Sequence, residues 1–166
     1  MPPNLDVYVL PRRRDLVTIN EFINKWVDRE ASEQRDDESL TLYHIGKTGE
    51  KTSEDEPAIS LTNIIARGLS LPRRAFWVYL KSIRTDLYNV VLGFTNDNRV
   101  VYGASIDDAN ENEMNLLLAK QVLKELAQDY EGEAGLIGCE EPPPIFPAQE
   151  YDEKKLLIFK WNKEED

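Results

Sequence analysis

The chain has 166 residues, and its 31 acidic side chains outnumber 20 basic ones to give a net charge of −11. Nucleic-acid binding depends largely on Lys and Arg side chains that neutralise phosphates, so this acidity argues against nucleic acid as a general partner. No apolar run approaches the roughly 18 residues that a membrane-spanning helix needs. The opening Met-Pro-Pro-Asn-Leu-Asp lacks signal-peptide features, and the single cysteine, Cys139, allows no internal disulfide. We therefore expect a cytoplasmic protein.

The charge is unevenly distributed along the chain. Residues 57–85 contain no carboxylate and carry +5, which leaves −16 on the remainder of the chain. The five cations of this segment are Arg67, Arg73, Arg74, Lys81 and Arg84. Charge separated in this way indicates recognition of a charged partner.

The first part of the chain predicts a strand followed by an amphipathic helix. Residues 5–10 are short and β-branched, and Pro11 should end the strand. Thr18 and Glu21 have the spacing of a capping box, and Val17 and Phe22 that of a hydrophobic staple. The apolar residues that follow at helical spacing are Ile19, Phe22, Ile23, Trp26 and Val27. They predict a helix that lies on a core.

The middle of the chain predicts one more strand, a loop and a short helix. Residues 40–45 read as a strand, whereas residues 46–57 have the Gly-rich and acidic composition of a mobile loop. Residues 58–67 favour a short helix, with Gly68 available as its C-terminal cap.

A three-stranded meander is expected over residues 75–106. Its strands are residues 76–80, 88–95 and 99–106, and the residues 96–98 between the last two tolerate the left-handed backbone of a tight hairpin.

The C-terminal part begins with a long helix at about residues 109–130. Its apolar stripe is expected to comprise Leu116, Ala119, Val122, Leu123, Leu126 and Tyr130. A strand at residues 136–139 and a closing strand at 155–161 flank a proline-rich strap at 140–150, whose Pro-x-x-Pro spacing favours an extended conformation. Residues 162–166 form an acidic tail.

This order of elements predicts an α+β fold, because hairpins are mixed with helices rather than alternating with them strictly. We expect one domain over residues 1–166. Its sheet should be largely antiparallel, with about five to seven strands and two principal amphipathic helices packed on it.

Acidic residues cluster at the start of the long helix, and they are Asp107, Asp108, Glu111 and Glu113. Oxygen ligands of this kind suit Mg²⁺ or Ca²⁺, but no regular calcium-loop spacing is present. Asp108 at the N-cap, with acids complementing the helix dipole, is the favoured interpretation. No metal or cofactor is expected.

The rare residues His44 and Cys139 suggest no catalytic centre. A catalytic His needs an orienting carboxylate and a nucleophile, and structural zinc needs further His or Cys ligands. We expect His44 to have a packing role.

The basic candidates are Arg12, Arg13, Arg14, Arg73 and Arg74. Each run follows a proline, so both are expected in exposed turns. The nearby aromatic residues 76, 77 and 79 have the composition of a stacking platform for single-stranded nucleic acid. Alternation along a strand, however, places Trp77 and Tyr79 on one face and Phe76 on the other, which core packing explains equally well.

These observations favour a non-catalytic acidic module that binds a protein, such as an inhibitor, antitoxin or immunity-type protein that masks a basic partner. Met114 and Leu117 lie off the apolar stripe of the long helix, so they form the expected centre of an interface if they are exposed, and self-association is an alternative use for it. Two further alternatives are a carboxylate-dependent hydrolase, with or without Mg²⁺, using Asp107, Asp108 and Glu111, and a nucleic-acid adaptor using the arginines.

Overall fold

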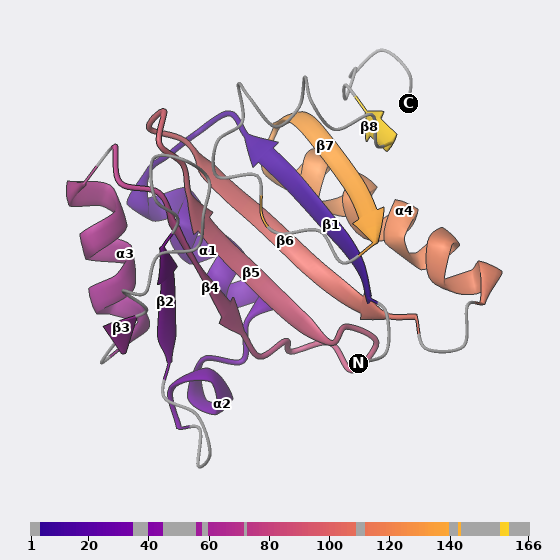
Figure 1. Cartoon of the computed structure of the whole chain (residues 1–166), viewed down its shortest axis with the longest axis horizontal. Coiled ribbons are helices and arrows are strands. Elements are labelled where there is room, and N and C mark those ends of the chain that lie inside the picture. Colours follow the sequence, from indigo (N-terminus) through magenta and orange to yellow (C-terminus); the bar gives the residue numbers. More distant parts are fainter. Residues whose placement is uncertain are drawn as a thin grey trace.

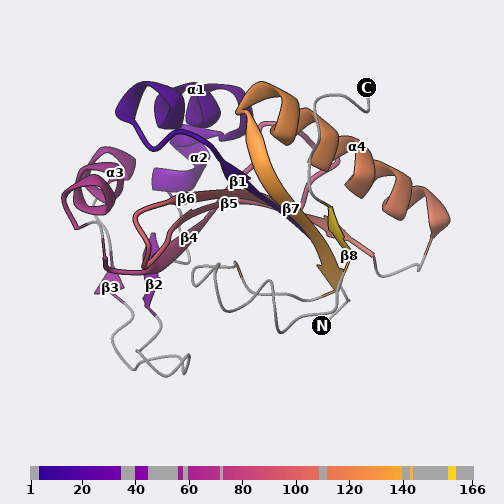
Figure 2. The ribbon, with the colours of Figure 1, turned by 90° about the horizontal axis from the view of Figure 1, so that it is seen from above.

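The computed structural model describes residues 4–34, 40–44, 56–57, 60–71, 73–108, 112–139, 143 and 157–159. One antiparallel sheet forms the middle of the molecule, with strands in the order β3-β2-β4-β5-β6-β1-β7-β8 (Figure 1). All four described helices lie on the same face of this sheet (Figure 2). This arrangement confirms the predicted α+β fold.

Six strands of the sheet have four residues or more, and a shorter strand lies at each edge. They are β1 (Asn4–Pro11), β2 (Thr41–His44), β3 (Glu56–Pro57), β4 (Phe76–Leu80), β5 (Asn89–Phe94), β6 (Val100–Asp107), β7 (Gly132–Cys139) and β8 (Leu157–Phe159). The predicted meander is confirmed as β4, β5 and β6. Asn98 adopts a positive φ of 67° in the hairpin that joins β5 to β6.

The helices are α1 (Leu16–Trp26), α2 (Arg29–Glu33), α3 (Leu61–Ser70) and α4 (Glu113–Asp129). The two longest, α1 and α4, are the principal helices that the sequence predicts.

Helix α1 begins earlier than predicted. Asp15, in extended conformation, is its N-cap, and the carboxylate accepts a hydrogen bond from the Thr18 amide at 2.8 Å. The capping box at Thr18 is therefore wrong, because a strong capping residue three positions upstream starts the helix first. The staple is wrong as well, since Val17 lies inside the helix and is 68% exposed. The apolar stripe is confirmed: Ile19, Phe22, Ile23 and Trp26 are buried.

Helix α3 runs from Leu61 to Ser70, with Ser60 as its N-cap. Gly68 lies within the helix and does not cap it. A Cβ at position 68 would come within 2.3 Å of the Phe94 ring, so the glycine permits close packing of α3 against β5.

Helix α4 and strand β7 also differ from their predicted limits. The helix begins at Glu113, and residues 109–111 lie outside the described part of the chain. Strand β7 begins at Gly132, four residues earlier than predicted. Its partner β1 supplies pairing from the first residue of β7, because Pro11 lies opposite Gly132.

The core lies mainly between the helices and the sheet, where Phe22 stacks on Tyr102 with ring centroids 4.1 Å apart. The predicted alternation in β4 is confirmed, because Phe76 belongs to this core whereas Trp77 belongs to a second buried cluster. The second cluster contains Tyr8, Leu10, Ala75, Trp77, Val91, Val101 and Leu136. The centre of the sheet is thus buried on both faces.

Several predicted segments lie wholly or partly outside the described residues. The loop prediction for residues 46–57 is wrong at its end, where Glu56–Pro57 pairs with β2, and residues 46–55 lie outside. In the strap at 140–150 only Pro143 is described, and it is buried. The closing strand is present as β8, and the tail at 162–166 lies outside.

Candidate protein-interaction surface

The start of α4 is fixed to the end of β6 by short polar contacts. Asn112 is the N-cap, and its side-chain oxygen accepts a hydrogen bond from the Met114 amide at 3.0 Å. The Asn115 side-chain amide donates to an Asp108 carboxylate oxygen at 2.7 Å. Asp108 therefore stabilises the linker before the helix and is not the predicted N-cap. The first turn of α4 has a defined position relative to the sheet.

Three apolar side chains of this first part of α4 are exposed. Met114 is 63% exposed, Leu117 50% and Leu116 37%. The expectation that Leu116 belongs to the buried stripe is wrong. Leu116 has the right angular position, but the start of α4 extends past the ends of the neighbouring strands (Figures 1 and 2), so no sheet lies beneath it. The buried stripe begins further along, at Ala119.

Acidic residues lie at the same end of α4 as Met114 and Leu117. Asp107 is the last residue of β6 and is exposed, Asp108 is half-buried, and Glu113 is exposed in the first helical turn. Glu111 lies outside the described residues. We use the name α4 patch for Met114 and Leu117 together with Asp107, Asp108 and Glu113.

The acidic residues of the α4 patch do not converge as metal ligands. Among the residues that the structure describes, no three His, Cys, Asp or Glu side chains come together in a group that could hold a metal ion. Asp108 accepts a hydrogen bond from Asn115, and Glu113 lies in the first turn of α4. These carboxylates give the start of α4 a negative charge.

His44 and Cys139 lie far apart in the sheet. His44 pairs with Phe76 of β4, and Cys139 pairs with Leu5 of β1. Their strands, β2 and β7, are separated by five inter-strand steps, which at about 4.8 Å each amount to about 24 Å. The two residues do not form a thiol–imidazole pair.

The fold brings both arginine runs to the same end of the sheet's strands. Arg12 and Arg13 follow β1, whereas Arg73 and Arg74 precede β4. Because β1, β6, β5 and β4 are successive antiparallel neighbours, the end of β1 and the start of β4 lie at the same end of these four strands. All four of these arginines are exposed, as predicted for turns.

Arg14 differs from the other arginines because it connects three elements. Its guanidinium donates to the Asn98 side chain in the β5–β6 hairpin and to the Gly68 carbonyl in α3. Partial burial lowers its pKa, and its Cζ lies 6.0 Å from the centroid of the Phe94 ring. The prediction of an exposed turn is wrong for Arg14, which holds the start of α1 beside the last part of α3.

Exposed apolar residues lie at the same end of the molecule as these arginines. Leu16 is 53% exposed and Val17 68% exposed in the first turn of α1, and Leu71 after α3 is 37% exposed. We use the name arginine end for Arg12, Arg13, Arg73 and Arg74 together with Leu16, Val17 and Leu71. The sequence does not reveal its apolar part, because the staple spacing predicts that Val17 packs against Phe22.

Trp77 does not provide an open stacking platform. It is only 6% exposed, and it stacks on Tyr43 with ring centroids 5.6 Å apart. A base can stack only on a ring whose face is accessible. Core packing accounts for the position of Trp77.

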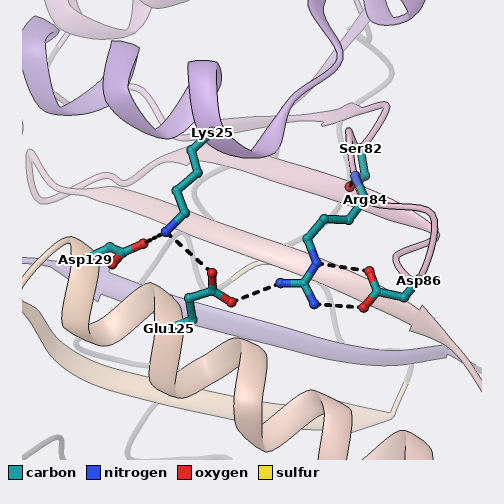
Figure 3. A network of polar contacts seen from close by, with 6 residues as sticks. All are labelled: Lys25, Ser82, Arg84, Asp86, Glu125 and Asp129. Carbon is teal, nitrogen blue, oxygen red and sulfur yellow. Dashed lines mark hydrogen bonds and ion pairs between the residues drawn. The ribbon is translucent and has the colours of Figure 1, made fainter.

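A network of ion pairs joins α1, α4 and the β4–β5 connection (Figure 3). Lys25 contacts Asp129 and, at 3.4 Å, Glu125. Arg84 bonds the other Glu125 oxygen at 2.9 Å and binds both oxygens of Asp86. The hydrogen bond with Asp86 raises the pKa of Arg84, and the same bond lowers the pKa of Asp86. Arg84 therefore has a structural role within the basic segment.

None of the described helices combines the length and apolar character needed to cross a membrane.

Comparison with known proteins adds no relative. No protein-family model, curated protein or solved structure matches this chain.

Proposed function

We propose that this chain is a non-catalytic protein-binding module that uses the α4 patch to cover a basic surface on a partner protein. An inhibitor, antitoxin or immunity-type role in the cytoplasm fits this proposal. The observation that carries it is the exposure of Met114 and Leu117 at the acidic start of α4.

The composition of the α4 patch supports protein binding. An interface commonly has an apolar centre, which excludes water, and a polar or charged rim that remains accessible. Exposed large apolar side chains that occur together mark interaction sites more often than single ones do. The α4 patch combines two such side chains, Met114 and Leu117, with Asp107, Asp108 and Glu113.

The charge of the whole chain supports a basic partner. With a net charge of −11, the protein attracts a basic surface over a range set by the ionic strength. The acidic rim then favours encounter in the correct orientation, which raises the association rate more than it lengthens the lifetime of the complex. The apolar centre supplies the contact that persists after encounter.

Capture from extracts of the native cell tests this proposal, with wild-type protein, Leu117→Lys and Asn24→Lys as baits. Asn24 is an exposed residue of α1, so the control adds the same charge outside the α4 patch. We expect a basic protein that binds wild type and the control. After identification and purification, this protein should bind Leu117→Lys at least about ten-fold more weakly by calorimetry. Its association rate with wild type should fall as salt increases.

Equal binding of the identified protein to all three baits would contradict the use of the α4 patch. Melting temperatures of the three proteins must agree, so that loss of binding is not loss of folding.

A further inference from the structure

The molecule carries two exposed apolar surfaces of opposite charge. The α4 patch is bordered by carboxylates, whereas the arginine end has Arg12, Arg13 and Arg73 around Leu16 and Val17. In Figure 1 the start of α4 and the start of α1 lie at opposite ends of the longest axis. Each surface therefore has on the same chain a counterpart of complementary charge.

Among the described residues, acids near the arginine end are already engaged or only loosely paired. Asp15 is engaged as the cap of α1, and Asp97 pairs with Arg99 at 2.7 Å. Glu131 forms an ion pair with Arg13 at the long separation of 4.0 Å, and the Arg13 side chain is 68% exposed. An ion pair this exposed contributes little, so Arg13 can exchange Glu131 for a carboxylate of another molecule.

The two surfaces of one molecule cannot reach each other. Strand β6 runs from one end of the sheet's strands to the other, with the hairpin beside Arg14 before it and α4 after it. Its eight residues span about 24 Å at roughly 3.4 Å per residue. Because Arg14 ties the arginine end to the β5–β6 hairpin and Asn115 ties the start of α4 to Asp108 after β6, any contact between the two surfaces must join two molecules.

We infer that the chain associates head to tail with a second copy, in which the α4 patch of one molecule docks on the arginine end of the next. This inference rests on the proposed use of the α4 patch and assigns its partner as another copy. The contact joins two different surfaces, so it leaves one of each free at the ends of every assembly. Growth beyond a dimer follows unless the geometry closes a ring.

Ionic strength determines how the two charge effects combine. Two molecules of net charge −11 repel each other, but at 0.15 M salt the Debye length is about 8 Å. The distant charges are then largely screened, while carboxylate–guanidinium pairs in contact are screened much less. Association should therefore be measured near this ionic strength, and it should weaken at higher salt.

Sedimentation velocity over a concentration series tests the inference with one variant for each surface. Leu117→Lys/Glu113→Lys reverses the α4 patch, and Val17→Asp/Arg73→Glu reverses the arginine end. Asn24→Lys is the folded control and should associate like wild type. We expect wild type to form species larger than a dimer, and each double variant alone to be at least about ten-fold weaker in self-association.

Mixing distinguishes head-to-tail contact from other arrangements. Each double variant keeps one intact surface, but the two intact surfaces are complementary. An equimolar mixture should therefore associate, whereas each double variant alone does not. Wild type that remains monomeric to about 1 mM, a weak-affinity limit, would overturn the inference. So would association that survives in Val17→Asp/Arg73→Glu, because the α4 patch would then pair with itself.

The same measurements separate this inference from the proposed function. A monomeric wild type that still captures a different basic protein through Leu117 would overturn only the head-to-tail contact. If Leu117→Lys lost neither self-association nor capture of the basic protein, the head-to-tail contact and the proposed function would both be contradicted.

Discussion

Helices α1 and α4 cover the same face of the sheet, but they use their apolar residues differently. Helix α1 buries its stripe almost completely, including the large rings of Phe22 and Trp26. Helix α4 buries smaller side chains from Ala119 onwards and exposes Met114 and Leu117. Helix α1 therefore serves stability from Ile19 to Trp26, whereas the first turn of α4 contributes little to the fold and is available for binding.

The largest effect on this comparison should come from Trp26→Ala. Trp26 is 1% exposed, and the Arg84 guanidinium lies 5.3 Å from its ring centroid. Removing a buried ring of this size should lower the free energy of unfolding by about 3–5 kcal/mol in urea denaturation. A loss below about 0.5 kcal/mol, the scale of surface substitutions, would contradict the role assigned to α1.

Removal of the α1 cap should cost less. Asp15→Ala deletes the acceptor for the Thr18 amide, so we expect a loss of about 1 kcal/mol in unfolding free energy. Thr18→Ala should cost less than about 0.5 kcal/mol, because Thr18 does not cap the helix. The opposite ranking in equilibrium denaturation would restore the capping box that the sequence suggests.

The same cap predicts a dependence on pH. The hydrogen bond from the Thr18 amide lowers the pKa of Asp15 in the folded protein. A lowered folded-state pKa stabilises the fold above the unfolded value of about 3.9 and loses this contribution as pH falls through the folded-state pKa. Asp15→Asn keeps a capping oxygen without a titrating group. The stability difference between wild type and Asp15→Asn should therefore be constant above about pH 5 and shrink below about pH 4. A difference independent of pH would contradict this.

The ion-pair network should couple α4 to the β4–β5 connection weakly. Arg84 and Glu125 are about one-third exposed, so a double-mutant cycle with Arg84→Met and Glu125→Gln should give about 0.2–1 kcal/mol. The coupling should decrease in high salt because the pair is partly exposed. A value near zero would leave the apolar contacts as the connection between these elements.

The sequence predicts the apolar faces better than the limits of the elements. Periodicity identifies the buried residues of α1 and the alternation in β4, because both follow from fixed backbone geometry. Limits depend on competition between neighbouring caps, as Asp15 and Thr18 illustrate. The exposure of Leu116 could not be predicted, because it depends on where the sheet ends beneath α4.

The candidate surfaces show the same division. The sequence identifies Met114 and Leu117 as outside the stripe, which depends only on helical spacing. The sequence does not reveal that Arg12 and Arg73 lie at the same end of the strands, because this depends on the strand order. It also gives no sign that Arg14 reaches Gly68, a contact between residues 54 positions apart.

The smallest effect on stability should come from Leu117→Lys. The side chain of Leu117 is 50% exposed and lies opposite the buried stripe, so a lysine there keeps its charge in water. We expect the unfolding free energy to change by less than about 0.5 kcal/mol. Leu126→Lys, at a fully buried position of the same helix, should instead lose several kcal/mol, because an unpaired charge would enter the core. If both variants were equally destabilised, the first turn of α4 would belong to the core, and the contrast between α1 and α4 would fail.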